Sequence, residues 1–261
     1  MGDGGKKMVL YRIAQILQED GPLRLFQGII SFLWCNTLRG HMPNATNVVI
    51  DEVYFDFAPA KKLGDRLFLH EGTWRYSQGG EIEAHFESTR LGDVVQIIGG
   101  GYGLTTVHAA RQVGKSGSVT VFEGGQIASH VRRTARLNDV DDVVTVEEAI
   151  IGDPTSLYQG VADDVEVIDP ADLPACDVLE MDCEGSELGI LQGMQIRPRV
   201  LIVELHPTMY EAPNAAPVEL IEEMGYEMVY WSTQGGEQMS EEEFRERLAD
   251  GYGDVLAAVR E

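Results

Sequence analysis

The feature that most constrains this chain is an apolar run that breaks into glycines, Val94-Val95-Gln96-Ile97-Ile98-Gly99-Gly100-Gly101-Tyr102-Gly103. The run has the character of a buried strand, and residues 104–113 then have the apolar spacing of a helix. Glycines let the backbone approach a ligand closely, and a helix N-terminus offers free N–H groups and a favourable dipole. This order predicts an α/β fold with a nucleotide-like ligand at the turn.

Strand and helix patterns alternate after residue 94, which predicts a parallel sheet covered by helices on both faces. We expect seven strands, at residues 94–98, 119–123, 143–150, 177–182, 200–205, 226–231 and 254–259. Helices are expected at 104–113, 127–138, 187–194, 216–224 and 240–249. The last of these opens with a capping box, Ser240 to Glu243. Helical crossovers should join the first five strands.

Residues 1–90 are expected to form an N-terminal helical and hairpin extension, and residues 91–261 the ligand-binding domain. The extension should contain amphipathic helices at 8–19 and 22–38, short strands between 40 and 76, and a helix at 80–90. The first two helices would pack on the main domain or on a second subunit of a homo-oligomer. Membrane contact is the less favoured alternative, because few basic residues flank them. The extension would serve as a lid, an oligomerisation element or a substrate-side module.

The chain is strongly acidic, with 43 acidic residues against 20 basic ones and a net charge of −23. Such a surface disfavours nucleic acid and anionic membranes as partners. It is typical of salt-adapted proteins, so we expect a halophilic archaeal origin. The N-terminus lacks a secretory pattern, and no apolar run approaches the roughly 18 residues that span a bilayer, which predicts a cytoplasmic protein. The three cysteines show no paired spacing, so no disulfide framework or zinc site is indicated.

The glycine spacing argues against a dinucleotide. A pyrophosphate-binding turn has the pattern G-x-G-x-x-G, whereas Gly99, Gly101 and Gly103 give G-x-G-x-G. Glu123 ends the next predicted strand, 24 residues after Gly99. An acid at that place accepts hydrogen bonds from two ribose hydroxyls. These residues favour S-adenosylmethionine over NAD as the cofactor.

Two later strand ends carry acidic motifs, Asp182-Cys183-Glu184-Gly185-Ser186-Glu187 and Val203-Glu204-Leu205-His206. Together with the glycine turn, Val121-Phe122-Glu123 and Leu137-Asn138, they resemble the FkbM family of S-adenosylmethionine-dependent methyltransferases over residues 92–210. The D-x-E-G-x-E pattern at 182–187 is the most specific part. The resemblance implies a seven-stranded, Rossmann-like class I methyltransferase fold with an antiparallel last strand. It also implies O-methylation, with a small-molecule or glycan hydroxyl as the acceptor.

The chain departs from the family at two places. The family has an acid two residues before the first glycine, where this chain has Ile97, and a proline after the strand-two acid, where it has Gly124. We expect Asp182 to take over the contact with the ammonium group of the cofactor. Two other functions stay open, a non-catalytic S-adenosylmethionine-binding or interaction protein and an NAD-dependent oxidoreductase.

The candidate site residues fall into two groups. The cofactor would be bound by Gly99, Gly101, Gly103, Glu123 and Asp182, and catalysis would involve Glu184 and His206. His206 is either a general base or a structural hydrogen-bonding residue before Pro207. Glu184 either orients the substrate or caps the helix near Ser186. Glu187 is expected to cap that helix, and Glu204 to be buried and paired.

No metal site is expected. The alternative is a divalent cation where Asp182, Glu184 and Glu204 converge, because carboxylate clusters bind such ions.

Overall fold

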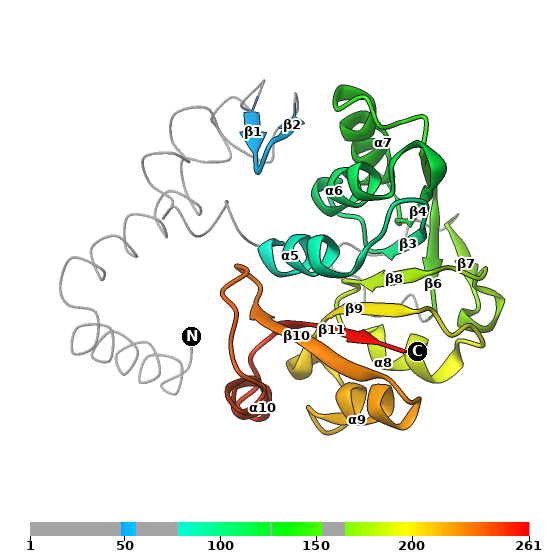
Figure 1. Ribbon diagram of the computed structural model, residues 1–261. Helices are drawn as coiled ribbons and strands as arrows, with labels where there is room; N and C mark the ends of the chain where they lie inside the picture. Colours follow the sequence, from blue (N-terminus) through cyan, green and yellow to red (C-terminus); the bar gives the residue numbers. More distant parts are fainter. Residues whose placement is uncertain (1–47, 56–77, 126, 153–164, 261) are drawn as a thin grey trace, which may run out of the picture. The chain divides into compact units, whose positions relative to one another are not determined.

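The computed structural model describes residues 48–55, 78–125, 127–152 and 165–260. Residues 49–55 and 75–261 belong to one compact unit, and a seven-stranded sheet lies at its centre (Figure 1). The other unit comprises residues 1–48 and 56–74, and except for Val48 it lies outside the described residues. The helices predicted at 8–19 and 22–38 and the strands predicted between 66 and 76 therefore also lie outside them.

The strand order of the sheet is β10-β11-β9-β8-β3-β4-β5. Its strands are β3 (Val94–Ile98), β4 (Ser118–Phe122), β5 (Val144–Glu147), β8 (Val178–Met181), β9 (Val200–Glu204), β10 (Glu227–Thr233) and β11 (Asp254–Val259). The last strand, β11, is antiparallel to both β9 and β10, and the other neighbours pair in parallel. The prediction of a mostly parallel seven-stranded sheet with an antiparallel last strand is confirmed.

Helices lie on both faces of the sheet, as predicted. They are α5 (Gly79–Ser88), α6 (Leu104–Val113), α7 (Ile127–Leu137), α8 (Glu187–Gly193), α9 (Ala216–Glu223) and α10 (Glu241–Ala249). α6 contacts α5 and α7 on one side, and α8 contacts α9 on the other (Figure 1). The side-chain hydroxyl of Ser240 accepts a hydrogen bond from the backbone N–H of Glu243 at 3.2 Å, which confirms the predicted cap of α10.

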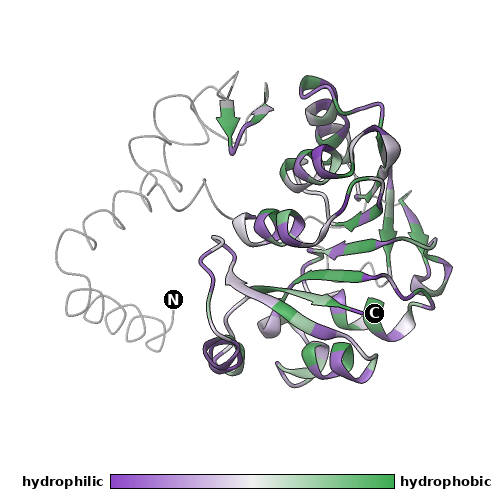
Figure 2. Cartoon of the chain, in the orientation of Figure 1, coloured by the Kyte–Doolittle hydropathy of each residue, from purple (hydrophilic) through white to green (hydrophobic). Residues whose placement is uncertain are grey.

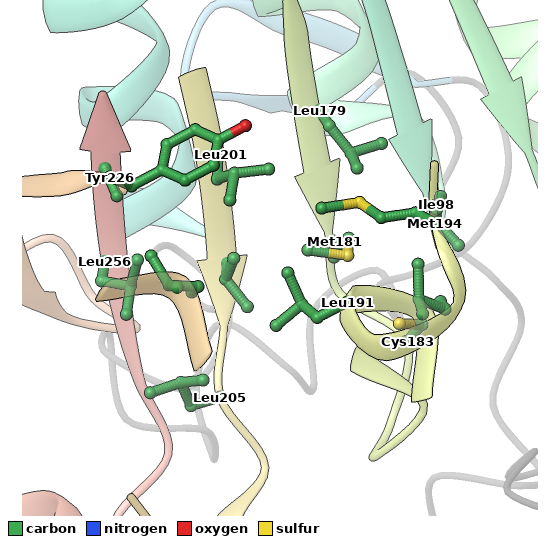
Figure 3. Packing of buried hydrophobic residues seen from close by; sticks show 14 of the residues in the cluster. Ile98, Leu179, Met181, Cys183, Leu191, Met194, Leu201, Leu205, Tyr226 and Leu256 are labelled. Carbon is green, nitrogen blue, oxygen red and sulfur yellow. The ribbon is translucent and has the colours of Figure 1, made fainter. Parts of the chain in front are cut away.

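The central strands are apolar because both of their faces are covered (Figure 2). Successive side chains of a strand point to opposite faces. Leu179 and Met181 of β8 and Leu201 of β9 pack with Leu191 of α8 in one buried cluster (Figure 3). The residue between the first two, Glu180, therefore points to the opposite face, which α5 covers. This alternation places Glu180 on the other face, among buried apolar neighbours such as Ile97 and Ile202.

The predicted third strand at 143–150 is wrong in part. The chain leaves the main sheet at Glu148, so that β5 stays in it while β6 (Ala149–Ile151) pairs in parallel with β7 (Glu166–Ile168). The predicted run contains no glycine or proline at the break, so no local signal indicates it. The described part of the connection to β8 contains β7 and a 3-10 turn, Pro170–Asp172, and residues 153–164, where a crossover helix could lie, are outside the described residues.

The strands β1 (Val48–Ile50) and β2 (Val53–Phe55) form a small two-stranded sheet at the predicted positions. Asn138, one of the residues on which the family resemblance rests, binds β2. Its side-chain amide donates to the carbonyl of Tyr54, and its side-chain oxygen accepts from the backbone N–H of Tyr54, both at 2.9 Å.

No helix in the described part of the chain is long and apolar enough to cross a membrane.

Candidate active site

The glycine turn between β3 and α6 has a backbone conformation in which any residue other than glycine would be strained. Gly99, Gly101 and Gly103 have φ angles of +89°, +49° and +87°. A Cβ added at Gly99 would lie 1.8 Å from the carbonyl oxygen of Asp182, which follows β8. The absence of a side chain therefore lets the turn pack directly against the end of the neighbouring strand. The three glycines predicted to bind the cofactor form this turn.

Glu123, at the end of β4, extends over the turn. Its two carboxyl oxygens accept hydrogen bonds from the backbone N–H groups of Gly101 and Gly124, at 2.8 and 2.9 Å. Burial raises the pKa of Glu123, and these two hydrogen bonds partly offset the rise. Each oxygen keeps lone pairs for further donors. At Gly101 an added Cβ would meet only Gln78 Nε2, at 3.8 Å, so the turn also leaves space beside this carboxylate.

A second group of site residues comes from the ends of β8 and β9. These strands pair in parallel, with Glu180 opposite Ile202 and Met181 opposite Val203. The same register places Asp182 beside Glu204, on the face of the sheet toward which Glu180 points. The sheet therefore brings these two acids together at its carboxyl edge, next to the glycine turn.

His206 lies among these acids in a fixed orientation. Its Nδ1 is 2.8 Å from Glu187 Oε1, which also accepts from the backbone N–H groups of Cys183 and Gly185. The opposite ring nitrogen, Nε2, faces Asp182 Oδ1 at 3.7 Å, Glu204 Oε1 at 3.7 Å and Glu184 Oε2 at 3.8 Å. The structure thus brings together the predicted residues Asp182, Glu184 and His206, and it adds Glu187 and Glu204 to them.

The charges around His206 decide its protonation. Burial alone would lower its pKa, but the hydrogen bond with Glu187 and the charges of Glu187, Glu204 and Asp182 raise it to about 9. At neutral pH the ring is therefore an imidazolium, which has no free lone pair to accept a proton. In this form His206 stabilises the neighbouring carboxylates, and its geometry favours the structural alternative over the role of a general base.

Glu81 is an acid that the sequence reasoning missed. It lies on α5, its exposed fraction is 0%, and its carboxyl group faces that of Glu204. Its pKa is raised well above the usual value by burial and then by Glu204, Asp182 and Glu180. The sequence patterns place its helix in the N-terminal extension, away from the strand ends. Only the spacing of Glu81 and His85 on one face of a helix could have indicated it.

Close packing at the start of α5 sets the position of Glu81. A Cβ at Gly79 would lie 2.5 Å from the carbonyl oxygen of Gly235, in the turn that follows β10. The same turn carries Gln234, whose side-chain amide donates to Glu204 and whose carbonyl accepts from the backbone N–H of Gly80. One turn therefore fixes both the start of α5 and the carboxylate at the end of β9.

His85 and Glu180 form a buried pair beneath these acids. His85 Nε2 is 2.6 Å from Glu180 Oε2, Nδ1 is 2.8 Å from Thr89 Oγ1, and both side chains of the pair have an exposed fraction of 0%. Ile97 pairs with Glu180 across β3 and β8. The acid that the family has in its first strand is thus absent at residue 97, but an acid lies at the same level of the neighbouring strand.

We expect replacement of one member of this pair to destabilise the protein strongly. Glu180→Leu or His85→Leu should each lower the free energy of unfolding by about 3 to 5 kcal/mol, because each leaves a buried polar partner uncompensated. The double variant should recover most of the loss. Chemical denaturation measures these values. Glu148→Gln, which breaks the exposed Arg132–Glu148 contact, is the control and should change the value by less than about 1 kcal/mol. Single losses that simply add in the double variant would show that the two residues are not coupled.

Residues 100–228 match the model of the methyltransferase FkbM domain. This segment begins in the glycine turn and includes Glu123, the acidic motif at 182–187 and His206. No curated protein sequence matches the chain.

Solved structures of methyltransferases are similar at low identity. A precorrin-6y C5,15-methyltransferase from Geobacter metallireducens is 17% identical, with a TM-score of 0.46, over 82% of this chain and 98% of that one. A SAM-dependent methyltransferase from Aquifex aeolicus is 12% identical, with a TM-score of 0.42, over 70% and 90%. The O-methyltransferase from Bacillus cereus in complex with SAH is 14% identical, with a TM-score of 0.40, over 70% and 80%.

Proposed function

The chain belongs to the methyltransferases that carry an FkbM domain, and from that premise we propose that it methylates a hydroxyl of a small molecule or glycan with S-adenosylmethionine. The observation that carries the proposal is the position of Glu123. Its carboxylate is held over the glycine turn by two backbone N–H groups and keeps lone pairs for ribose hydroxyls.

The residues around the turn fit the cofactor. Gly99, Gly101 and Gly103 would contact it through their backbone, Glu123 would bind the ribose, and Asp182 would bind the ammonium group. The cofactor supplies a methyl group on a positively charged sulfur, which an acceptor oxygen displaces in line. The acidic edge around Asp182 suits such a cation, because opposite charges attract most strongly where water is excluded.

We propose that Glu184 is the general base that removes the proton of the acceptor hydroxyl. Its side chain is 38% exposed, so it is open to a substrate, and its Oε2 lies 3.8 Å from His206 Nε2. A carboxylate near the reacting oxygen takes the proton as the new C–O bond forms. The imidazolium of His206 cannot take this role, and it would hold Glu184 and Asp182 in place by its charge.

The test is methyl transfer from isotopically labelled S-adenosylmethionine to a panel of sugars, phenols and cell extracts, with the protein in high salt. We expect label in a base-stable methyl ether. Glu184→Gln should lower kcat about 100-fold or more, while the exposed Glu166→Gln on β7 leaves it unchanged. Binding of cofactor without transfer to any acceptor would favour the non-catalytic alternative. Equal activity in Glu184→Gln would remove this residue as the base.

A further inference from the structure

We propose that Asp182, Glu204 and His206 form a binding site for one divalent cation, with Glu81 as a fourth ligand contributed by α5. The proposal goes beyond methyl transfer, because the site needs neither cofactor nor acceptor. It also reverses the expectation from the sequence that the chain has no metal site.

The distances suit a coordination sphere better than a set of hydrogen bonds. One ligand atom from each of Asp182, Glu204 and His206 lies within 4.8 Å of the other two. His206 Nε2 is 3.7 Å from an oxygen of each acid, too long for a hydrogen bond. In an octahedral site with bonds of about 2.1 Å, ligand atoms lie about 3.0 Å apart when adjacent and about 4.2 Å apart when opposite. A small cation between these atoms would need only slight movement of the side chains.

His206 is held as metal-binding histidines usually are. Such residues normally donate from the second ring nitrogen to a carboxylate or carbonyl, which fixes the ring and leaves the first nitrogen facing the ion. Here Nδ1 contacts Glu187 Oε1 at 2.8 Å, and Glu187 is itself fixed by the backbone N–H groups of Cys183 and Gly185. The nitrogen that faces Asp182 and Glu204 is therefore the one that would bind the ion, and it would release its proton to solvent as the ion binds.

Glu81 is the independent observation, because it comes from a helix and not from the strand ends. It is completely buried, its carboxyl group faces that of Glu204, and its oxygens have no further hydrogen-bond partner. Its nearest charged neighbours are Glu204 and Asp182. A buried acid beside two others is costly unless a cation or a proton compensates it. A cation bound between them would compensate Glu81 in place of a proton shared with Glu204.

The donor set indicates which cation to expect. Carboxylate oxygens suit Mg²⁺ and Mn²⁺, and an imidazole nitrogen shifts the preference toward transition metals. The nearby thiol of Cys183 is buried, and its pKa is raised well above the usual value by burial, so a thiolate-selecting metal is disfavoured. We therefore take Mn²⁺ as the cation that fits best, and its paramagnetism makes it a direct probe.

The test is titration of the full chain with MnCl2 after treatment with EDTA, in the absence of S-adenosylmethionine, following free Mn²⁺ by electron paramagnetic resonance. We expect one ion per chain. Glu204→Gln should weaken binding at least 10-fold, and the exposed Glu148→Gln should not change it. Less than one ion per chain for the wild type, or unchanged affinity in Glu204→Gln, would overturn the proposal.

Glu81→Gln gives a second test, in which the Tm is measured with and without Mn²⁺. Removing a buried acid beside two others should raise the Tm of the metal-free protein. The further rise in Tm on adding Mn²⁺ should be smaller than in the wild type, because one ligand is lost. An undiminished rise would show that Glu81 is not a ligand. Since neither experiment measures methyl transfer, failure of the metal site and failure of the proposed activity are separate results.

Discussion

Gly99→Ala should lower the free energy of unfolding by about 2 to 6 kcal/mol and abolish cofactor binding. The new Cβ would lie 1.8 Å from the carbonyl oxygen of Asp182, so two strand ends must separate to admit it. The φ of +89° adds strain that a side chain cannot relieve. Such strain costs about 1 to 3 kcal/mol, and overpacking a tight interior costs a similar amount. Chemical denaturation measures the first effect and calorimetric titration with S-adenosylhomocysteine the second.

Gly189→Ala is the matched control. Gly189 lies inside α8, and a Cβ there would meet no atom within 4 Å. Alanine in a helix loses less conformational entropy on folding than glycine, so this variant should gain about 0.5 to 1 kcal/mol and bind cofactor normally. If Gly99→Ala were as stable as Gly189→Ala, the close contact between the turn and β8 would be wrong.

Glu123→Ala should weaken the binding of S-adenosylhomocysteine at least about 100-fold, with a smaller effect on stability. The variant loses the proposed bonds to two ribose hydroxyls, and charge-assisted hydrogen bonds contribute about 1.5 to 3 kcal/mol each. It also loses the two hydrogen bonds that fix the turn at Gly101 and Gly124. Calorimetric titration gives the affinity, and thermal unfolding shows whether the fold persists.

Two further variants separate charge from position. Glu123→Gln keeps an acceptor oxygen but no charge, so its affinity should fall between those of the wild type and Glu123→Ala. Glu147→Ala removes an exposed acid from the end of the next strand, β5, and should bind normally. Normal binding by Glu123→Ala would remove this residue from the ribose site.

Local patterns predicted the sheet well where strand and helix are separated by clear signals. The strand at 94–98 and the helix at 104–113 were located to the residue, because glycines divide them. The run at 143–150 was not divided correctly, because its break at Glu148 depends on pairing with β7, a strand far along the chain. Such long-range pairing leaves no local mark.

The sequence likewise predicts one part of the candidate site and misses another. Residues that end parallel strands, such as Glu123, Asp182 and His206, could be placed at one edge by topology alone. Glu81 could not, because its position depends on how α5 packs on the turn at Gly235. The protonation of His206 is also beyond the sequence, because it depends on how closely the acids of two segments, 182–187 and 204–206, gather around one ring.

The most direct test of the account is calorimetric titration of the wild-type chain, in high salt, with S-adenosylhomocysteine and with NAD. The glycine turn, Glu123 and the FkbM domain predict one molecule of S-adenosylhomocysteine bound per chain and no measurable binding of NAD. Binding of NAD alone would contradict the assignment of this chain as an S-adenosylmethionine-dependent methyltransferase.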